Sequence, residues 1–312
     1  MSSTISSDSI VRQLKTCFMR LPHVDRILGR LSDLAGYVCG AEEPDHLFVI
    51  GETGTGKSTL LIRFAAGFGR IEHESITEIP VLYVQVPSRC TIKRLATILL
   101  RQMGSPFYNR GDEEDRTHQL ITLLRACKVR VVIVDEVNHL VDRGGRVTHY
   151  AIGDWIKQTF DLASVSCVLA GTPRSTLLLD TNEQMADRFR EIVKLPTFSI
   201  ETPEETKDLQ RMLKAFRKQL GDLPSVDFSG GTLPAQILFA TGGRFRDVKR
   251  LLSRAVEIAF QEDAPALRIE CFARAFSEVI FVDAEAKRNP FLPEFNGLPL
   301  TQPGEPFAKP RA

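Results

Sequence analysis

The sequence lacks the features of a secreted, membrane-spanning or disulfide-stabilised protein. Its six cysteines are scattered without a C-x-x-C pair, and its six histidines are equally dispersed, so the pattern favours reduced, packed cysteines over a metal site. No stretch reaches the roughly 18 apolar residues of a membrane span, and the N-terminal MSSTISSDSIVRQLK has no uninterrupted apolar core. We therefore expect a cytoplasmic protein with no membrane partner.

The chain also has no overall excess of either charge. Its 40 lysines and arginines nearly balance 39 aspartates and glutamates, for a formal net charge of +1. Global charge therefore does not indicate nucleic-acid binding, and any basic surface has to be local. The 312 residues, 43% of them hydrophobic, suffice for one large or two modest domains.

Up to residue 200, apolar runs of strand length alternate with helical patterns. The runs LFVI, VLYVQV, VRVVIVD, SCVLAG and LPTFSI are expected to form strands at 47–50, 81–86, 129–135, 166–171 and 195–200. Strands that are apolar throughout and alternate with helices form a parallel sheet that is covered on both faces. The sequence thus predicts an α/β core at 41–200 with a parallel five-stranded sheet.

The segments that flank this core follow other patterns. Apolar residues at helical spacing predict an N-terminal helical extension over 1–40, and a small helical domain is expected over 201–282. The helical domain begins at TPEE, 202–205, which combines an N-cap threonine, a proline and a capping-box glutamate. Residues 283–312 are rich in proline and predict a flexible tail, in which FLPEF (291–295) is either a docking motif or part of a disordered end.

The segment GETGTGKS, 51–58, directly follows the first expected strand and matches G-x-x-x-x-G-K-[ST]. Glycines let such a loop curl so that backbone N–H groups and the next helix N-terminus face phosphates. Lys57 would reach the β- and γ-phosphates, and the Ser58 hydroxyl would coordinate Mg²⁺. ATP and Mg²⁺ are therefore the expected cofactors, the alternative being a glycine-rich turn that binds nothing. The expected nucleotide contacts are consecutive: Gly51, Glu52, Thr53, Gly54, Thr55, Gly56, Lys57, Ser58 and Thr59.

Two carboxylates end the buried run VVIVDE. Asp135 would hold Mg²⁺, and Glu136 would orient or deprotonate the attacking water. An isolated Asp-Glu pair is weak evidence, but downstream of a phosphate loop it strongly favours ATP hydrolysis. The pair also argues against a small-metabolite kinase, which needs an acceptor pocket instead.

Further polar residues could complete such a site. Thr172 follows the run 166–171, and it either senses the γ-phosphate or only begins the next helix. Arg188, in EQMADRFR, either faces the nucleotide of a neighbouring subunit or belongs to a solvated helix end. In GGRFRDV, either Arg244 or Arg246 could reach the same phosphates, and the sequence leaves that choice open.

These elements, in this order, resemble an AAA+ ATPase over about residues 20–280. The segments VDEVNHL, AGTP and EQMADRFR narrow the resemblance to the TniB/TnsC family, the ATP-dependent regulators of transposons with DDE transposases, including RNA-guided ones. The resemblance implies that Arg188 is an arginine finger and Thr172 the first sensor. It also implies a ring or helical filament on double-stranded DNA, with a heptamer among the options, that links a TniQ-like target selector to a transposase.

The resemblance adds a DNA-facing surface as well. In this family the helix after the second strand and the adjacent loops line the central pore, where basic side chains contact phosphates without sequence choice. Without the resemblance, these loops would be taken as solvated faces. The corresponding residues are Arg89, Lys93, Arg94, Arg110, Arg143 and Arg146.

Two other functions fit parts of the pattern. One is a different AAA+ class, a helicase loader or a secretion-associated ATPase, although the sequence shows no membrane span or peptidoglycan-binding module for the latter. The other is a nucleotide-gated scaffold with little turnover, against which the Asp135-Glu136 pair argues.

Overall fold

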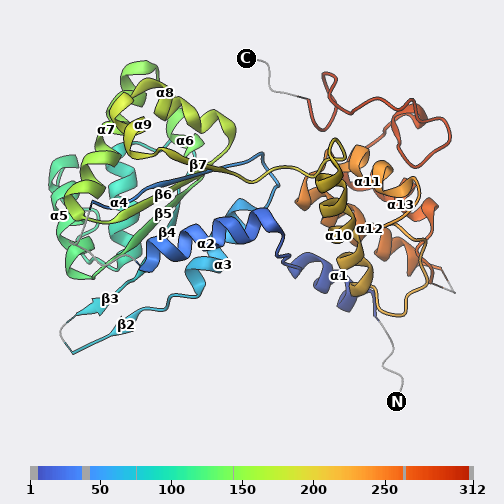
Figure 1. The fold of residues 1–312 in the computed structure, drawn as a ribbon, viewed down its shortest axis with the longest axis horizontal. Helices are drawn as coiled ribbons and strands as arrows, with labels where there is room; N and C mark the ends of the chain where they lie inside the picture. The colour runs from blue at the N-terminus through green and yellow to red at the C-terminus, as the bar shows by residue number, and fades with distance from the viewer. Residues whose placement is uncertain (1–5, 37–42, 75, 143, 263–264, 309–312) are drawn as a thin grey trace. The chain divides into compact units, whose positions relative to one another are not determined.

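The computed structural model describes residues 6–36, 43–74, 76–142, 144–262 and 265–308. The chain divides into two compact units (Figure 1). The larger unit spans Pro22–Leu195, and the smaller one combines Met1–Leu21 with Pro196–Ala312. Each unit encloses a hydrophobic core of its own.

The larger unit is built on a parallel five-stranded sheet with the strand order β4-β5-β6-β1-β7. Every residue of β1, β5 and β6 is buried, as their apolar composition predicts for central parallel strands. The predicted α/β core with a five-stranded parallel sheet is therefore confirmed. The strands are β1 (Leu47–Ile50), β4 (Val81–Gln85), β5 (Val131–Asp135), β6 (Ser166–Gly171) and β7 (Glu191–Lys194).

Helices cover both faces of this sheet. Alternate sheet residues such as Phe48 and Val132 form one core cluster with the helices α4, α5 and α7, while α2 and α3 lie together on the other side (Figure 1). A short hairpin, β2 (Ile71–Glu72) and β3 (Thr77–Glu78), follows α3. The helices of this unit are α2 (Pro22–Gly36), α3 (Lys57–Ala66), α4 (Ile92–Met103), α5 (Glu113–Ala126), α6 (Asn138–Val141), α7 (Arg146–Ala163), α8 (Leu177–Thr181) and α9 (Glu183–Arg188).

The fifth strand does not lie where the sequence placed it. We expected LPTFSI, 195–200, whereas β7 is EIVK, 191–194, and pairs only with β1. Its residues alternate between half-buried and exposed because β7 is an edge strand, and edge strands commonly carry charged side chains. A search for continuous apolar runs therefore passes over it. Leu195 still donates its N–H to Ile50 O at 2.7 Å, which extends the pairing by one bond.

The smaller unit is helical. It begins α10 with the predicted capping box, in which the Thr202 hydroxyl accepts the Glu205 N–H at 3.2 Å and the Glu205 carboxylate accepts the Thr202 N–H at 3.1 Å. Ile10 and Leu14 of α1 are buried in the same core as α12. The predicted extension over 1–40 is therefore divided, since α1 belongs to this unit and α2 to the larger one. The helices are α1 (Ser7–Thr16), α10 (Pro203–Gln219), α11 (Leu233–Thr241), α12 (Phe245–Ala259) and α13 (Ile269–Val279).

The described part of the C-terminal segment, 283–308, is packed, which differs from the flexible tail that we expected. Phe291, of the FLPEF motif, is 5% exposed and Leu300 is 1% exposed, both within the core of the smaller unit. Arg288 forms a two-pronged ion pair with Glu305, at 2.6 and 2.8 Å. Proline content excludes a regular helix or central strand, but it does not exclude packing through side chains.

The Arg288–Glu305 pair generates a stability prediction. Burial opposes the charge of Glu305, but the Arg288 guanidinium outweighs it, so the pKa of Glu305 lies below its ordinary value. The stabilisation is therefore complete above the ordinary glutamate pKa and is lost as the pH falls through the lowered one. We expect Glu305→Gln to destabilise the packed 286–308 segment at pH 7 by about 3 kcal/mol, because it leaves Arg288 buried without its counter-charge.

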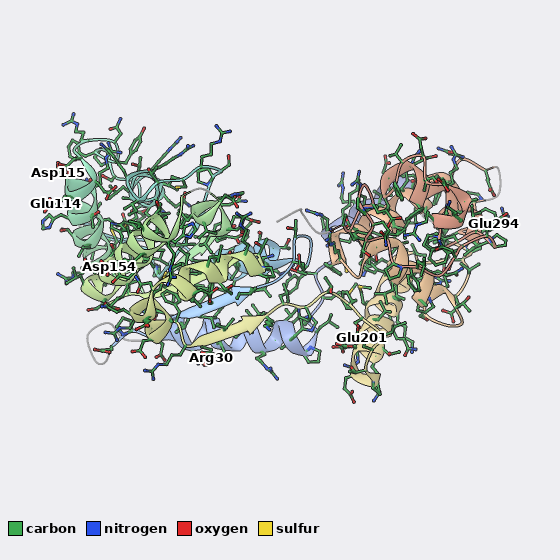
Figure 2. All side chains as sticks on the ribbon, turned by 90° about the horizontal axis from the view of Figure 1, so that it is seen from above. Arg30, Glu114, Asp115, Asp154, Glu201 and Glu294 are labelled. Carbon is green, nitrogen blue, oxygen red and sulfur yellow. The ribbon has the colours of Figure 1, made fainter. Side chains whose placement is uncertain are left out.

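Hydrogen exchange of 286–308 measures this effect. Glu294→Gln is the matched control, because Glu294 is exposed and points outward in the same segment (Figure 2). Equal protection in both variants at pH 7 would show that the ion pair does not hold the segment.

Candidate nucleotide-binding site

Because the strands run parallel, the loops that carry the expected site residues all begin at the carboxyl ends of the strands, which form one edge of the sheet. Ile50 at the end of β1 pairs with Gly171 at the end of β6, and Val134 near the end of β5 pairs with Leu169. Gly51 donates its N–H to Gly171 O at 3.1 Å, one residue beyond the strand. The loops after β1, β5 and β6 therefore begin side by side, which places the phosphate loop beside the Asp135-Glu136 turn and Thr172.

The phosphate loop needs glycine at specific points. Gly54 and Gly56 have φ angles of 87° and 105°, in the left-handed region that side chains disfavour. At Gly51, an added Cβ would lie 2.5 Å from Leu195 O, so the close approach of two backbones excludes a side chain. The loop therefore favours glycine at each of these three positions.

The start of α3 presents positive groups to the interior of this loop. Gly56 is the N-cap and has no side chain, so it leaves the first N–H groups of α3 without a side-chain cap. Lys57 is 5% exposed, and its ammonium donates to Gly51 O at 2.6 Å and Glu52 O at 3.0 Å. With the half-buried Ser58 next to it, this arrangement offers amide donors, an ammonium and a hydroxyl, which are groups that fit a triphosphate and its magnesium ion.

Asp135 is fully buried at the end of β5, and both of its oxygens are oriented. Oδ2 accepts the Tyr83 hydroxyl at 2.9 Å, and Oδ1 accepts the backbone N–H of Glu136 at 2.8 Å. Burial and the charge of Asp135 raise the pKa of Tyr83, so its hydroxyl stays protonated and donates. A carboxylate held in one orientation suits coordination of Mg²⁺ directly or through water.

Sequence reasoning missed Tyr83. It lies on β4, the neighbouring strand, and pairs with Ile133 two residues before Asp135. The signal was a tyrosine within the mostly apolar run VLYVQV, and only the pairing of β4 with β5 gives it a meaning.

Glu136 has a strained backbone. Its φ of 58° puts a residue with a side chain in the left-handed region, which is uncommon outside glycine and is found at active sites. The hydrogen bond from its N–H to Asp135 and the bond from Val137 N–H to Ala170 O, at 2.9 Å, hold this turn. The Glu136 side chain is half-buried, and the residue follows β5 at the carboxyl end of the sheet, where the phosphate loop also begins.

Thr172 lies at the same edge, directly after β6. Its N–H donates to Oδ1 of the buried Asn138 at 3.2 Å, which ties it to the segment that follows Glu136. Thr172 does precede a short 3₁₀ helix, Pro173–Thr176, as the alternative interpretation expected. Its hydroxyl makes no capping bond there, so the side chain is not needed to begin that helix. Asn138 is a second residue whose role the sequence did not predict.

Arg188 lies at the other edge of the sheet, which is formed by the amino ends of the strands. It lines a polar hollow of about 330 Å³ together with His46 and Glu191, the residues at the amino ends of β1 and β7. The phosphate loop instead follows the carboxyl end of β1. Within this unit, Arg188 is therefore on the far side of the strand from its own phosphate loop.

Arg244 and Arg246 lie in the smaller unit, at the start of α12. The guanidinium of Arg244 stacks over the Phe307 ring at 4.8 Å, whereas Arg246 is exposed and lies 3.7 Å from the Asp247 carboxylate. The phosphate loop belongs to the other unit. The choice between these two arginines as second sensor therefore stays a prediction with two candidates.

The basic residues predicted to face DNA are exposed on the larger unit. Of this set, Arg89 lines a hollow of about 370 Å³, together with residues such as Thr91, Glu113 and Gly144. Arg143 lies outside the described residues. The described members of the set are Arg89, Lys93, Arg94, Arg110 and Arg146.

Two solved structures with a similar fold are a Cdc6p and an ORC1 protein. Cdc6p from Pyrobaculum aerophilum matches with a TM-score of 0.65 and 16% identity, over 88% of this chain and 71% of that chain. The Aeropyrum pernix ORC1 protein, solved in complex with DNA, matches with a TM-score of 0.56 and 20% identity, over 86% of this chain and 69% of that chain. Sheet order, phosphate loop and this likeness together show the P-loop fold of the AAA+ class.

The family is narrower than this class. The family described as "Bacterial TniB protein" matches residues 10–200, and the chain belongs to this TniB family. The predicted resemblance is thereby confirmed.

Two curated relatives are ORC1-type DNA replication proteins. The one from Sulfurisphaera tokodaii is 25% identical over 266 residues, 83% of this chain and 63% of the relative. The one from Archaeoglobus fulgidus is 26% identical over 126 residues, 40% of this chain and 31% of the relative. The chain thus spans less than two thirds of the length of either relative.

Within the described ranges, no helix combines the length and the apolar character needed to cross a bilayer.

The Tyr83–Asp135 hydrogen bond generates a binding prediction. Tyr83→Phe removes one bond to a buried carboxylate, worth about 1 kcal/mol, and so raises about fivefold the magnesium concentration needed for half-maximal binding of a fluorescent ATP analogue. Tyr150→Phe, an exposed tyrosine on α7, is the control. An unchanged magnesium dependence in Tyr83→Phe would show that Asp135 does not need the Tyr83 hydroxyl to orient it.

Proposed function

We propose that this protein is an ATP-dependent regulator of DNA transposition that oligomerises on double-stranded DNA. It links a TniQ-like target selector to a transposase, and ATP hydrolysis drives its disassembly. One observation carries the ATPase part: the buried Asp135 and the left-handed Glu136 lie at the same sheet edge as the phosphate loop. Membership of the TniB family supports the transposition part.

In this proposal the phosphate loop holds ATP. The N–H groups at the start of α3 and the Lys57 ammonium bind its phosphates, since these groups already converge inside the loop. Ser58 and the oriented carboxylate of Asp135 would hold Mg²⁺, which neutralises charge on the phosphates when bound. No other described carboxylate has this combination of burial and position.

Hydrolysis then depends on three side chains. Glu136 accepts a proton from the attacking water or orients it, and the free hydroxyl of Thr172 contacts the γ-phosphate. Arg188 cannot serve the phosphate loop at the far end of its own β1, so it acts on the nucleotide of an adjacent subunit. Turnover would thus require an oligomer, which couples hydrolysis to the state of assembly.

A helicase loader is the second candidate, and the similarity to ORC1-type DNA replication proteins favours it. The two candidates differ in what they do with naked duplex DNA. Negative-stain microscopy with ATP and duplex DNA separates them, because a transposition regulator of this kind forms rings or filaments along the duplex without a helicase present.

The Glu136 assignment predicts a trapped assembly. Glu136→Gln keeps the size and the backbone turn but removes the proton acceptor, so we expect ATP binding and filaments to persist while turnover falls about a hundredfold or more. Phosphate release measured with and without duplex DNA tests this. Hydrolysis by Glu136→Gln at the wild-type rate would remove Glu136 from the mechanism. A wild-type protein without any turnover would instead favour the scaffold.

The basic surface predicts a salt-dependent DNA contact. Lys93 and Arg94 are exposed in the first turn of α4, so Lys93→Ala with Arg94→Ala should weaken duplex binding for every sequence alike. The slope of log affinity against log salt should become shallower by about two, because about two phosphate contacts are lost. Lys214→Ala with Lys218→Ala, two exposed lysines on α10, makes the same charge change elsewhere. Equal salt slopes in the two double variants would refute the assignment.

A further inference from the structure

A chain of polar contacts lies behind Arg188. His46, just before β1, is 5% exposed, and its Nδ1 accepts the backbone N–H of Cys167 at 3.0 Å. Because Nδ1 acts as the acceptor, the ring proton of the neutral imidazole is on Nε2. Nε2 lies 3.3 Å from Oδ1 of Asp161, in the last turn of α7, and donates to it. The Phe189 ring stacks on the imidazole at 4.8 Å and fixes its plane.

The second oxygen of Asp161 holds the arginine. Oδ2 forms an ion pair with Nε of Arg188 at 3.3 Å. Burial opposes the charge of Asp161, but the His46 hydrogen bond and the Arg188 charge outweigh it, so the pKa of Asp161 is lowered and the carboxylate stays ionised near neutral pH. One anchored carboxylate therefore fixes the inner side of the guanidinium.

An outer nitrogen of Arg188 meets a different partner. NH1 pairs with Glu43, whose side chain is 78% exposed and enters the polar hollow from the segment before β1. Such an exposed pair contributes about 0–1 kcal/mol, so another anion can replace Glu43 at little cost. Arg30, labelled in Figure 2, also lines the hollow, but Glu191 accepts from two of its nitrogens. Arg188 thus combines a fixed inner contact with a replaceable outer one.

We propose that Asp161, oriented by His46, is the positioning residue that aims Arg188 at the γ-phosphate of an adjacent copy of this chain. Glu43 takes the place of that phosphate until the subunits meet. The inference rests on the proposed role of Arg188 at the ATP site of a neighbouring subunit. It adds the residues that hold the arginine in place for that role.

Asp161→Asn tests the inference, because it keeps the shape of the side chain and removes the charge that holds Nε. In assembled protein on duplex DNA we expect kcat to fall by about ten- to a hundredfold, since the arginine is no longer held in place. KM for ATP stays unchanged, because the phosphate loop of the same subunit is intact. Asp161→Glu, which keeps the charge, retains part of the activity.

Mixing subunits separates positioning from misfolding. Asp161→Asn subunits have intact ATP sites but a defective arginine, whereas Glu136→Gln subunits have an intact arginine and a defective ATP site. A mixture of the two recovers turnover, because each Asp161→Asn site receives a competent Arg188 from its neighbour. A mixture of Asp161→Asn with Arg188→Ala does not recover, because both lack a competent arginine.

Matched variants complete the test. Asp154→Asn, the same change on α7 (Figure 2), leaves kcat unchanged, and Glu43→Gln does not lower it. Failure of the Glu136→Gln mixture to recover would show that Asp161 is only structural. Normal turnover in Asp161→Asn, with loss in Arg188→Ala, would overturn the positioning role and leave the arginine finger standing. Normal turnover in Arg188→Ala would overturn the finger itself, and the inference with it.

Discussion

The parallel pairing of β1 with β6, and of β6 with β5, is the constraint on which the rest of the site depends. Each strand ends within a residue or two of its neighbour, so the phosphate loop, the Asp135-Glu136 turn and Thr172 start from one line. The bond from Gly51 N–H to Gly171 O continues that pairing into the loop itself. A side chain at Gly51 would collide with Leu195 O, so the sheet and the loop can coexist only with glycine there.

The two ends of the strands in this sheet carry different functional groups. The carboxyl edge holds the groups that fit ATP and its magnesium ion, and the amino edge holds Arg188 with its supporting Asp161 and His46. On the proposed role of Arg188, one chain carries two complementary halves of a site at opposite ends of short strands. Under the proposed function, this separation makes hydrolysis a consequence of assembly, because only neighbouring copies can bring the halves together.

The sequence predicted those strands whose apolar composition directly reflects their burial in the fold. Runs such as SCVLAG are buried on both sides, and the structure ends that strand at the residues that the pattern gave. We did not predict β7 because it is an edge strand. An edge strand tolerates charged residues such as Glu191 and Lys194, so it shows no continuous apolar run. The C-terminal segment differs from the expected tail because Phe291 and Leu300 pack into the core and Arg288 meets Glu305, contacts that join residues separated along the chain. Tyr83 and Asn138 orient site residues across strands and loops, and such partners carry no local pattern.

By itself, the sequence determined the kind of chemistry: glycine spacing, a lysine, a serine and a carboxylate pair are local features whose physical demands are visible in one segment at a time. Only the tertiary structure decided which groups act together. It placed Tyr83 on Asp135, turned Glu136 into the left-handed region, and put Arg188 on the far edge of the sheet with Asp161 behind it. The physical reason is that strand register and burial join residues distant in sequence, and these contacts fix the orientation and charge on which a site depends.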